Sequence, residues 1–61
     1  MPESLLKEFI DKESTITLVG EDHEKITGKV IGVEGYWIKI KDNKTTRVIN
    51  GAIIRDIETN N

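Results

Sequence analysis

The sequence of 61 residues contains no cysteine, one histidine and one proline. A chain without cysteine cannot form a disulfide, and a single histidine cannot complete a zinc site of the Cys/His type. A domain of about 60 residues buries only roughly 60% of the surface of its unfolded chain, so chains of this length often need such reinforcement. Contacts with further subunits are the main reinforcement left, which favours an oligomer.

A large excess of one charge is also lacking, because nine Lys and Arg residues stand against eleven Asp and Glu residues. A protein dedicated to duplex DNA usually carries an excess of cations, so a nucleic-acid function would need a local basic surface or a ring of repeated subunits. The chain has no apolar run as long as a membrane span and no basic segment typical of a signal peptide. We therefore expect a cytoplasmic protein without a membrane partner.

The spacing of the apolar residues predicts one helix followed by five short strands. Within residues 1–12, one stripe of an amphipathic helix is formed by Leu5, Leu6, Phe9 and Ile10. Alternating residues then predict strands at 14–19, 25–34, 36–41, 45–50 and 52–57, followed by a tail at 58–61 whose last three residues are expected to fray. Because turns rather than helices join these strands, the expected fold is a single, mostly β domain over residues 1–61. Its antiparallel sheet bends strongly and closes into a small barrel.

Two glycines interrupt the second predicted strand. Gly28 and Gly32 stand among β-branched residues, where a glycine marks a bulge or a close approach of two backbones. We therefore expect this strand to bend.

Two stretches of the sequence resemble the motifs of a known family. Residues 28–37 read Gly-Lys-Val-Ile-Gly-Val-Glu-Gly-Tyr-Trp, and residues 49–54 read Ile-Asn-Gly-Ala-Ile-Ile. Together with the order of the predicted elements, they resemble the Sm-like (Lsm) family, which includes the bacterial Hfq-type proteins. The second motif is divergent, because Asn50 and Gly51 stand where Hfq-like members have a Lys-His pair and other members have an arginine.

The resemblance implies a subunit of a homo-oligomeric ring, typically a hexamer or heptamer, whose fourth strand pairs with the fifth strand of the next subunit. The short strands at 45–50 and 52–57 would otherwise be exposed sheet edges, which ring closure removes. Ile53 and Ile54 fit this arrangement, since one can fill the barrel while the other meets a neighbour. The alternative is that the N-terminal helix covers both isoleucines.

The resemblance also implies binding of single-stranded RNA, with a base stacked on Tyr36 and held at a rim of Asn50 and Gly51. Stacking on an aromatic side chain contributes roughly 1–3 kcal/mol per base. The alternative is that Tyr36 is a core or rim residue with a hydrogen-bonded hydroxyl. Asn50 and Gly51 supply no cation, which weakens the case for RNA.

The third predicted strand carries a second candidate surface. Its residues alternate between two faces, with Tyr36, Ile38 and Ile40 on one face and Trp37, Lys39 and Lys41 on the other. An aromatic ring beside two lysines is typical of a strip that binds nucleic acid. The alternative is that Trp37 packs under the N-terminal helix or at a subunit contact, while the lysines are only solvated.

The residues favour no catalytic function, no cofactor and no metal site. His23 lies in an acidic turn at 20–24, where a weak metal contact is less common than simple solvation. Two functions stay open: a ring protein that binds single-stranded RNA, and a small-barrel module that contacts a protein partner. Cations around Tyr36 and Asn50 would favour RNA, whereas acids there would favour a protein partner.

Overall fold

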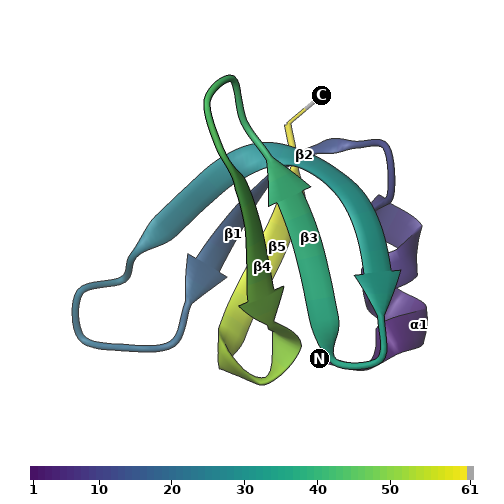
Figure 1. Cartoon of the computed structure of the whole chain (residues 1–61). Helices are drawn as coiled ribbons and strands as arrows, with labels where there is room; N and C mark the ends of the chain where they lie inside the picture. Colours follow the sequence, from purple (N-terminus) through teal and green to yellow (C-terminus); the bar gives the residue numbers. More distant parts are fainter. Residues whose placement is uncertain (61) are drawn as a thin grey trace.

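The computed structural model describes residues 1–60 as a short helical segment followed by a five-stranded antiparallel sheet (Figure 1). The helical elements are α1 (Glu3–Leu6) and two 3-10 turns, η1 (Lys7–Phe9) and η2 (Gly51–Ile53). The strands are β1 (Glu13–Leu18), β2 (Lys25–Glu34), β3 (Trp37–Lys41), β4 (Thr46–Asn50) and β5 (Ile54–Thr59). The mostly β class, the five strands and their antiparallel pairing confirm the sequence prediction.

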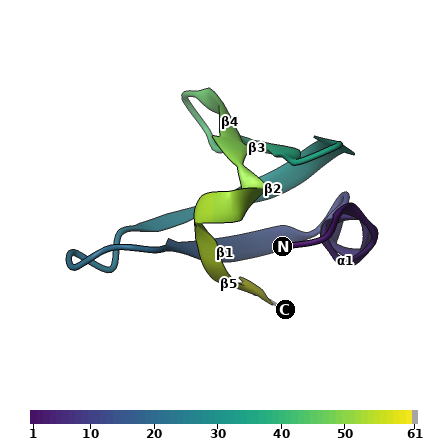
Figure 2. The same cartoon turned by 90° about the horizontal axis from the view of Figure 1, so that it is seen from below.

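The long strand β2 bends and folds the sheet over on itself (Figures 1 and 2). Its residues 25–29 pair with β1, whereas residues 29–34 pair with β3. A bulge directly before Gly32 shifts the pairing with β3. At Gly28 the backbones approach closely, since a Cβ built there would lie 2.7 Å from the carbonyl oxygen of Lys41. The predicted bend, the bulge and the close approach are all confirmed.

One hydrophobic core fills the space enclosed by the bent sheet. Its buried members come from α1 and from every strand: Leu6, Ile16, Leu18, Ile26, Val30, Ile38, Ile40, Ile49 and Ile54. Each fully buried aliphatic side chain stabilises the fold by about 1.5–3 kcal/mol relative to an exposed one. The core therefore fixes which face of each strand remains available for binding.

The sheet is not closed within one chain. Its strand order is β4-β3-β2-β1-β5, which leaves β4 and β5 as the two edges. Among residues 1–60, β4 pairs only with β3, and β5 pairs only with β1. The closed barrel that the sequence predicts is thus not formed by a single copy.

The N-terminal segment is less helical than predicted. Instead of an amphipathic helix within residues 1–12, it forms four α-helical residues and a 3-10 turn. Of the predicted stripe only Leu6 is fully buried, and Leu5 is 49% exposed. Backbone hydrogen bonds to β2 replace further helical turns, with the Asp11 N–H donating to the Val30 carbonyl oxygen at 2.7 Å. A short helix is only marginally stable by itself, so the hydrogen bonds to β2 determine the conformation of this segment.

The C-terminal strand also differs from the prediction. The 3-10 turn η2 occupies the start of the predicted strand 52–57, and β5 continues to Thr59. Asn60 stays bound to β1, because its N–H donates to the Glu13 carbonyl oxygen at 2.8 Å. The predicted fraying is therefore wrong for Thr59 and Asn60, while Asn61 lies outside the described residues.

Candidate nucleic-acid interface

Strand β3 separates its side chains into a buried and an exposed face, as predicted. Ile38 and Ile40 belong to the core, whereas Trp37, Lys39 and Lys41 are exposed. Trp37 keeps 51% of its surface exposed and borders a groove made with β2 and β4. The alternative that Trp37 packs under the N-terminal helix is therefore wrong, and the alternative of a subunit contact stays open.

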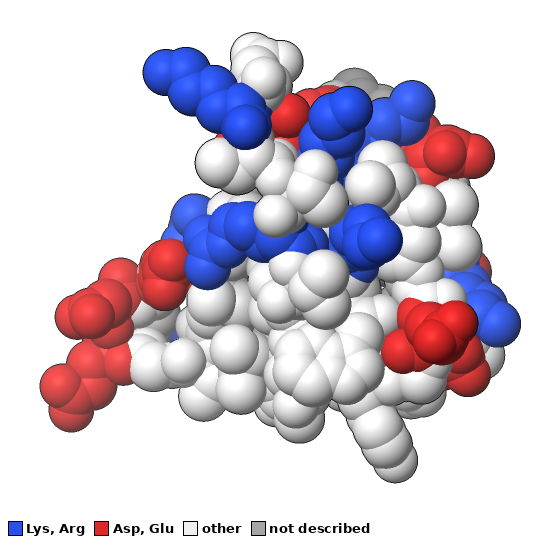
Figure 3. Space-filling view, in the orientation of Figure 1, with Lys and Arg blue, Asp and Glu red and all other residues white. Residues whose placement is uncertain are grey.

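The neighbouring strands extend this exposed face on both sides of β3. Lys41 lies opposite Lys29 of β2, and Lys39 lies opposite Val48 of β4. Side chains directly opposite each other in antiparallel strands share one face of the sheet, and all four are exposed. In Figure 3, Lys and Arg form a band over β3 and β4, while acids lie to either side. The face beside Trp37 is therefore locally basic although the whole chain is slightly acidic.

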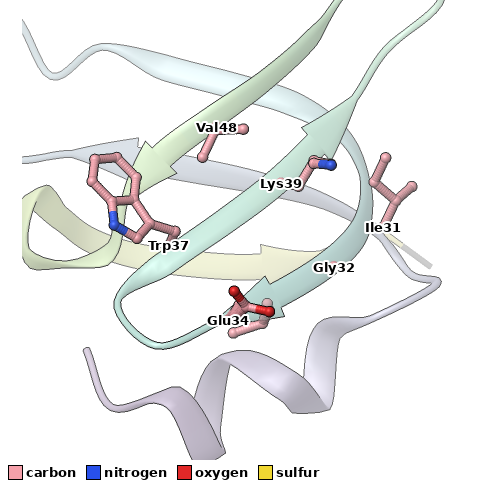
Figure 4. Close-up of a pocket in the computed structure, with 7 residues that line it drawn as sticks. Ile31, Gly32, Glu34, Trp37, Lys39 and Val48 are labelled. Atoms are coloured by element: carbon pink, nitrogen blue, oxygen red, sulfur yellow. The ribbon is translucent and has the colours of Figure 1, made fainter.

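An open groove of about 410 Å³ runs along this face (Figure 4). The residues labelled around it come from three adjacent strands: Ile31, Gly32, Glu34, Trp37, Lys39 and Val48. The groove thus combines exposed apolar side chains with the Lys39 ammonium group and the Glu34 carboxylate. We did not predict Ile31, Glu34 or Val48 as groove residues from the sequence, because the strand register, rather than local periodicity, brings them beside Trp37. For Ile31 and Val48 the one sequence signal is an apolar residue on the face of a strand that is otherwise polar, and Glu34 has no such signal.

Tyr36 lies in the turn between β2 and β3, and 70% of its surface is exposed. The alternative of a core tyrosine is therefore wrong, and so is the prediction that Tyr36 belongs to the third strand on the face of Ile38 and Ile40. Its neighbours in a second, smaller hollow are Pro2, Glu3 and Gly35. The Glu3 carboxylate accepts a hydrogen bond from the Gly35 N–H at 2.9 Å and lies 3.6 Å from the Lys7 ammonium. The hollow beside Tyr36 is therefore lined by a carboxylate that is paired with Lys7, and the N-terminal ammonium donates to the Gly51 carbonyl oxygen at 3.2 Å.

Asn50 and Gly51 hold the backbone together at the end of β4. The Asn50 side chain accepts a hydrogen bond from the Ala52 N–H at 2.9 Å and so caps η2. The Gly51 N–H donates to the Tyr36 carbonyl oxygen. A Cβ at Gly51 would lie 2.9 Å from that oxygen and 3.1 Å from Leu6 Cδ1. The predicted rim residues Asn50 and Gly51 do lie close to Tyr36, but both already form hydrogen bonds that hold the local backbone.

The two isoleucines after Ala52 face opposite sides, as predicted. Ile54 is 6% exposed and belongs to the core, whereas Ile53 is 46% exposed. The alternative that the N-terminal helix covers both is wrong. Ile53 precedes β5 and Val48 lies on β4, so exposed apolar surface adjoins both free edges of the sheet.

The acidic turn between β1 and β2 reaches both edge strands. Glu24 Oε2 lies 3.8 Å from Arg47 Nη1 on β4, and His23 Nδ1 lies 3.0 Å from Arg55 Nη1 on β5. His23 and Arg55 are 32 positions apart, so the sequence alone gives no signal for this contact. Among residues 1–60, no group of three or more His, Cys, Asp or Glu side chains is arranged to hold a metal ion.

No protein-family model, curated protein or solved structure matches this chain. No helix within residues 1–60 combines the length and the apolar character needed to cross a membrane.

Proposed function

We propose that this protein is an Sm-like small β-barrel subunit that assembles with identical copies and binds single-stranded RNA. The observation that carries the RNA proposal is the exposed Trp37 indole on the same face as Lys29, Lys39 and Lys41. An indole offers a stacking platform to any base, and the lysines neutralise phosphates. Each stacked base contributes roughly 1–3 kcal/mol.

The rim at Tyr36 extends this surface. Asn50 lies opposite Trp37 in the register of β3 and β4, so the rim and the basic face are continuous. Tyr36 offers a second exposed ring next to Trp37 in the chain. Because Glu3 lines the hollow beside Tyr36, we expect this second ring to contribute less to RNA affinity than Trp37 does.

The free edges β4 and β5 support assembly with identical copies. A free edge presents a row of backbone donors and acceptors that can pair with another strand. β4 has five residues and β5 has six, so one strand can pair along the other. Such pairing would also cover part of Ile53, which precedes β5 and is 46% exposed. A ring of six or seven copies would complete every edge and repeat the basic face in each subunit.

A protein partner is the second candidate, and the charge beside Tyr36 favours it. Glu3 places a carboxylate at the hollow where RNA binding would call for a cation. An exposed tyrosine beside an acid suits a peptide contact better than a phosphate contact. The RNA candidate is centred on the groove beside Trp37, whereas the protein-partner candidate is centred on the hollow beside Tyr36.

The RNA proposal has a direct reporter, because Trp37 is the only tryptophan in the chain. We expect oligo-uridine and oligo-adenine to quench its fluorescence at low salt, with an affinity that falls as salt rises. By anisotropy of labelled RNA, the double substitution Lys39→Gln and Lys41→Gln should weaken binding by about tenfold or more.

Two further variants make this test specific. Tyr36→Ala should weaken binding less than the double substitution does. Lys12→Gln, which removes the charge of a residue that lines neither hollow, should leave RNA affinity close to that of the wild type. If the wild-type protein shows no response to oligonucleotides of any of the four bases, the RNA proposal is wrong and the protein-partner candidate gains.

A further inference from the structure

One carboxylate lies within the face that otherwise carries lysines. Glu34 ends β2 and lies opposite Trp37 in the register of β2 and β3, so both side chains share one face of the sheet. Figure 4 shows both residues near the start of β3, with the Glu34 carboxylate on the β2 side and the Trp37 indole directed towards β4. Glu34 is exposed and forms no ion pair with another residue in the described range 1–60. Its charge is thus available to a ligand in the groove.

The Glu34 carboxylate is unfavourable for a site that binds a polyanion such as RNA. A negative charge beside the phosphate backbone repels it and lowers affinity for every RNA sequence. The repulsion is offset where the carboxylate accepts hydrogen bonds from a base, because bonds with a charged acceptor are stronger than neutral ones. Glu34 therefore lowers affinity for RNA in general, and lowers it least for a base that donates hydrogen bonds to the carboxylate.

We infer that the groove beside Trp37 selects guanine in single-stranded RNA, an inference that rests on the RNA binding proposed above. The Watson–Crick edge of guanine presents two adjacent donors, the N1–H and the N2 amino group. A carboxylate offers only acceptors and can take both donors at once. Uracil presents a single N3–H between two carbonyl oxygens, which a carboxylate repels. Adenine and cytosine each present one amino group beside an acceptor nitrogen.

The remaining walls of the groove suit the other parts of a guanine nucleotide. The half-exposed indole of Trp37 provides the stacking surface. Ile31 and Val48, which are 39% and 55% exposed, provide apolar walls for the base. Lys39 lines the same groove and can contact a phosphate. The volume of about 410 Å³ lies within the usual range of small-molecule sites, roughly 300–1,000 Å³.

The test uses uridine hexamers that differ only at their two central positions, which are uridine, guanosine, adenosine or cytidine. Trp37 fluorescence is measured for each at low salt. We expect the guanosine hexamer to bind the wild-type protein about five- to tenfold more tightly than the uridine hexamer. In Glu34→Gln the uridine hexamer should bind at least as tightly as in the wild type, because a repulsive charge is lost. The preference of the Glu34→Gln variant for the guanosine hexamer over the uridine hexamer should fall to about twofold or less.

Glu58→Gln is the matched control, because it removes the same charge from β5, which contributes no residue to the groove. It should keep the wild-type preference, and circular dichroism should show that both variants are folded. Equal affinity of the wild type for all four hexamers would overturn the guanine inference while leaving the proposed RNA binding in place. A preference that survives in Glu34→Gln would do the same. No quenching by any hexamer would overturn both.

Discussion

Replacing Gly28 with alanine should push β3 away from the bend of β2. A Cβ at this position would lie 2.7 Å from the carbonyl oxygen of Lys41, 3.0 Å from its carbonyl carbon and 3.1 Å from Ile40 Cγ1. The first two are backbone atoms, so the clash is relieved only by moving the strand. Overpacking of this kind costs about 1–3 kcal/mol. Domains of this size have about 3–9 kcal/mol of stability in total, so the loss would be large.

Gly32→Ala is the control, because it makes the same exchange in the same strand. A Cβ there meets no described atom within 4 Å, and the residue has no left-handed φ. The reduced freedom of the unfolded chain should then stabilise the protein by about 0.4–1 kcal/mol.

Urea unfolding at one fixed protein concentration, followed by circular dichroism, measures both variants. With an m value of about 1 kcal/mol per M, the midpoint should fall by roughly 1–3 M for Gly28→Ala and rise slightly for Gly32→Ala. A Gly28→Ala midpoint equal to that of the wild type would refute the close approach of the two backbones.

Two further perturbations test local parts of the fold. Gly51→Ala would place a Cβ 2.9 Å from the Tyr36 carbonyl oxygen, so urea unfolding should show a loss of about 1–3 kcal/mol, and an unchanged midpoint would argue against this packing. Hydrogen bonds from the backbone N–H groups that follow Asp42, the Thr45 N–H first, hold the pKa of the Asp42 carboxyl below its usual value of about 3.9. Because the folded-state pKa is lowered, the contribution of Asp42 to stability is present above the unfolded pKa and is lost as the pH falls through the folded value. An NMR titration of this carboxyl should give a midpoint below the usual value, and a normal or raised midpoint would contradict these hydrogen bonds.

Residue spacing predicts the strands of this protein well, because burial in a half-buried strand alternates with a period of two. The alternation of Ile38 and Ile40 with Trp37 and Lys39 in β3 is an example. The same reasoning fails for the N-terminal segment, where a helical stripe of apolar residues competes with backbone hydrogen bonds to β2. Asp11 makes such a bond, and no local pattern encodes it.

The candidate site was predictable only in part. Trp37 and Lys39 follow from alternation within one strand, but their neighbours Glu34 and Val48 depend on the register of three strands. A bulge in β2 shifts that register, and its effect on pairing cannot be read from composition. The carboxylate of Glu3 beside Tyr36 depends in turn on how the N-terminal segment folds back.

Sedimentation equilibrium at micromolar concentration tests most directly whether identical copies complete the edges β4 and β5. We predict a mass several times that of the 6.9 kDa chain. Ile53→Lys, which places a charge beside the edge strand β5 and outside the groove, should shift this mass towards the monomer. A wild-type mass of 6.9 kDa would contradict the proposal, because both edges would then remain unpaired in solution.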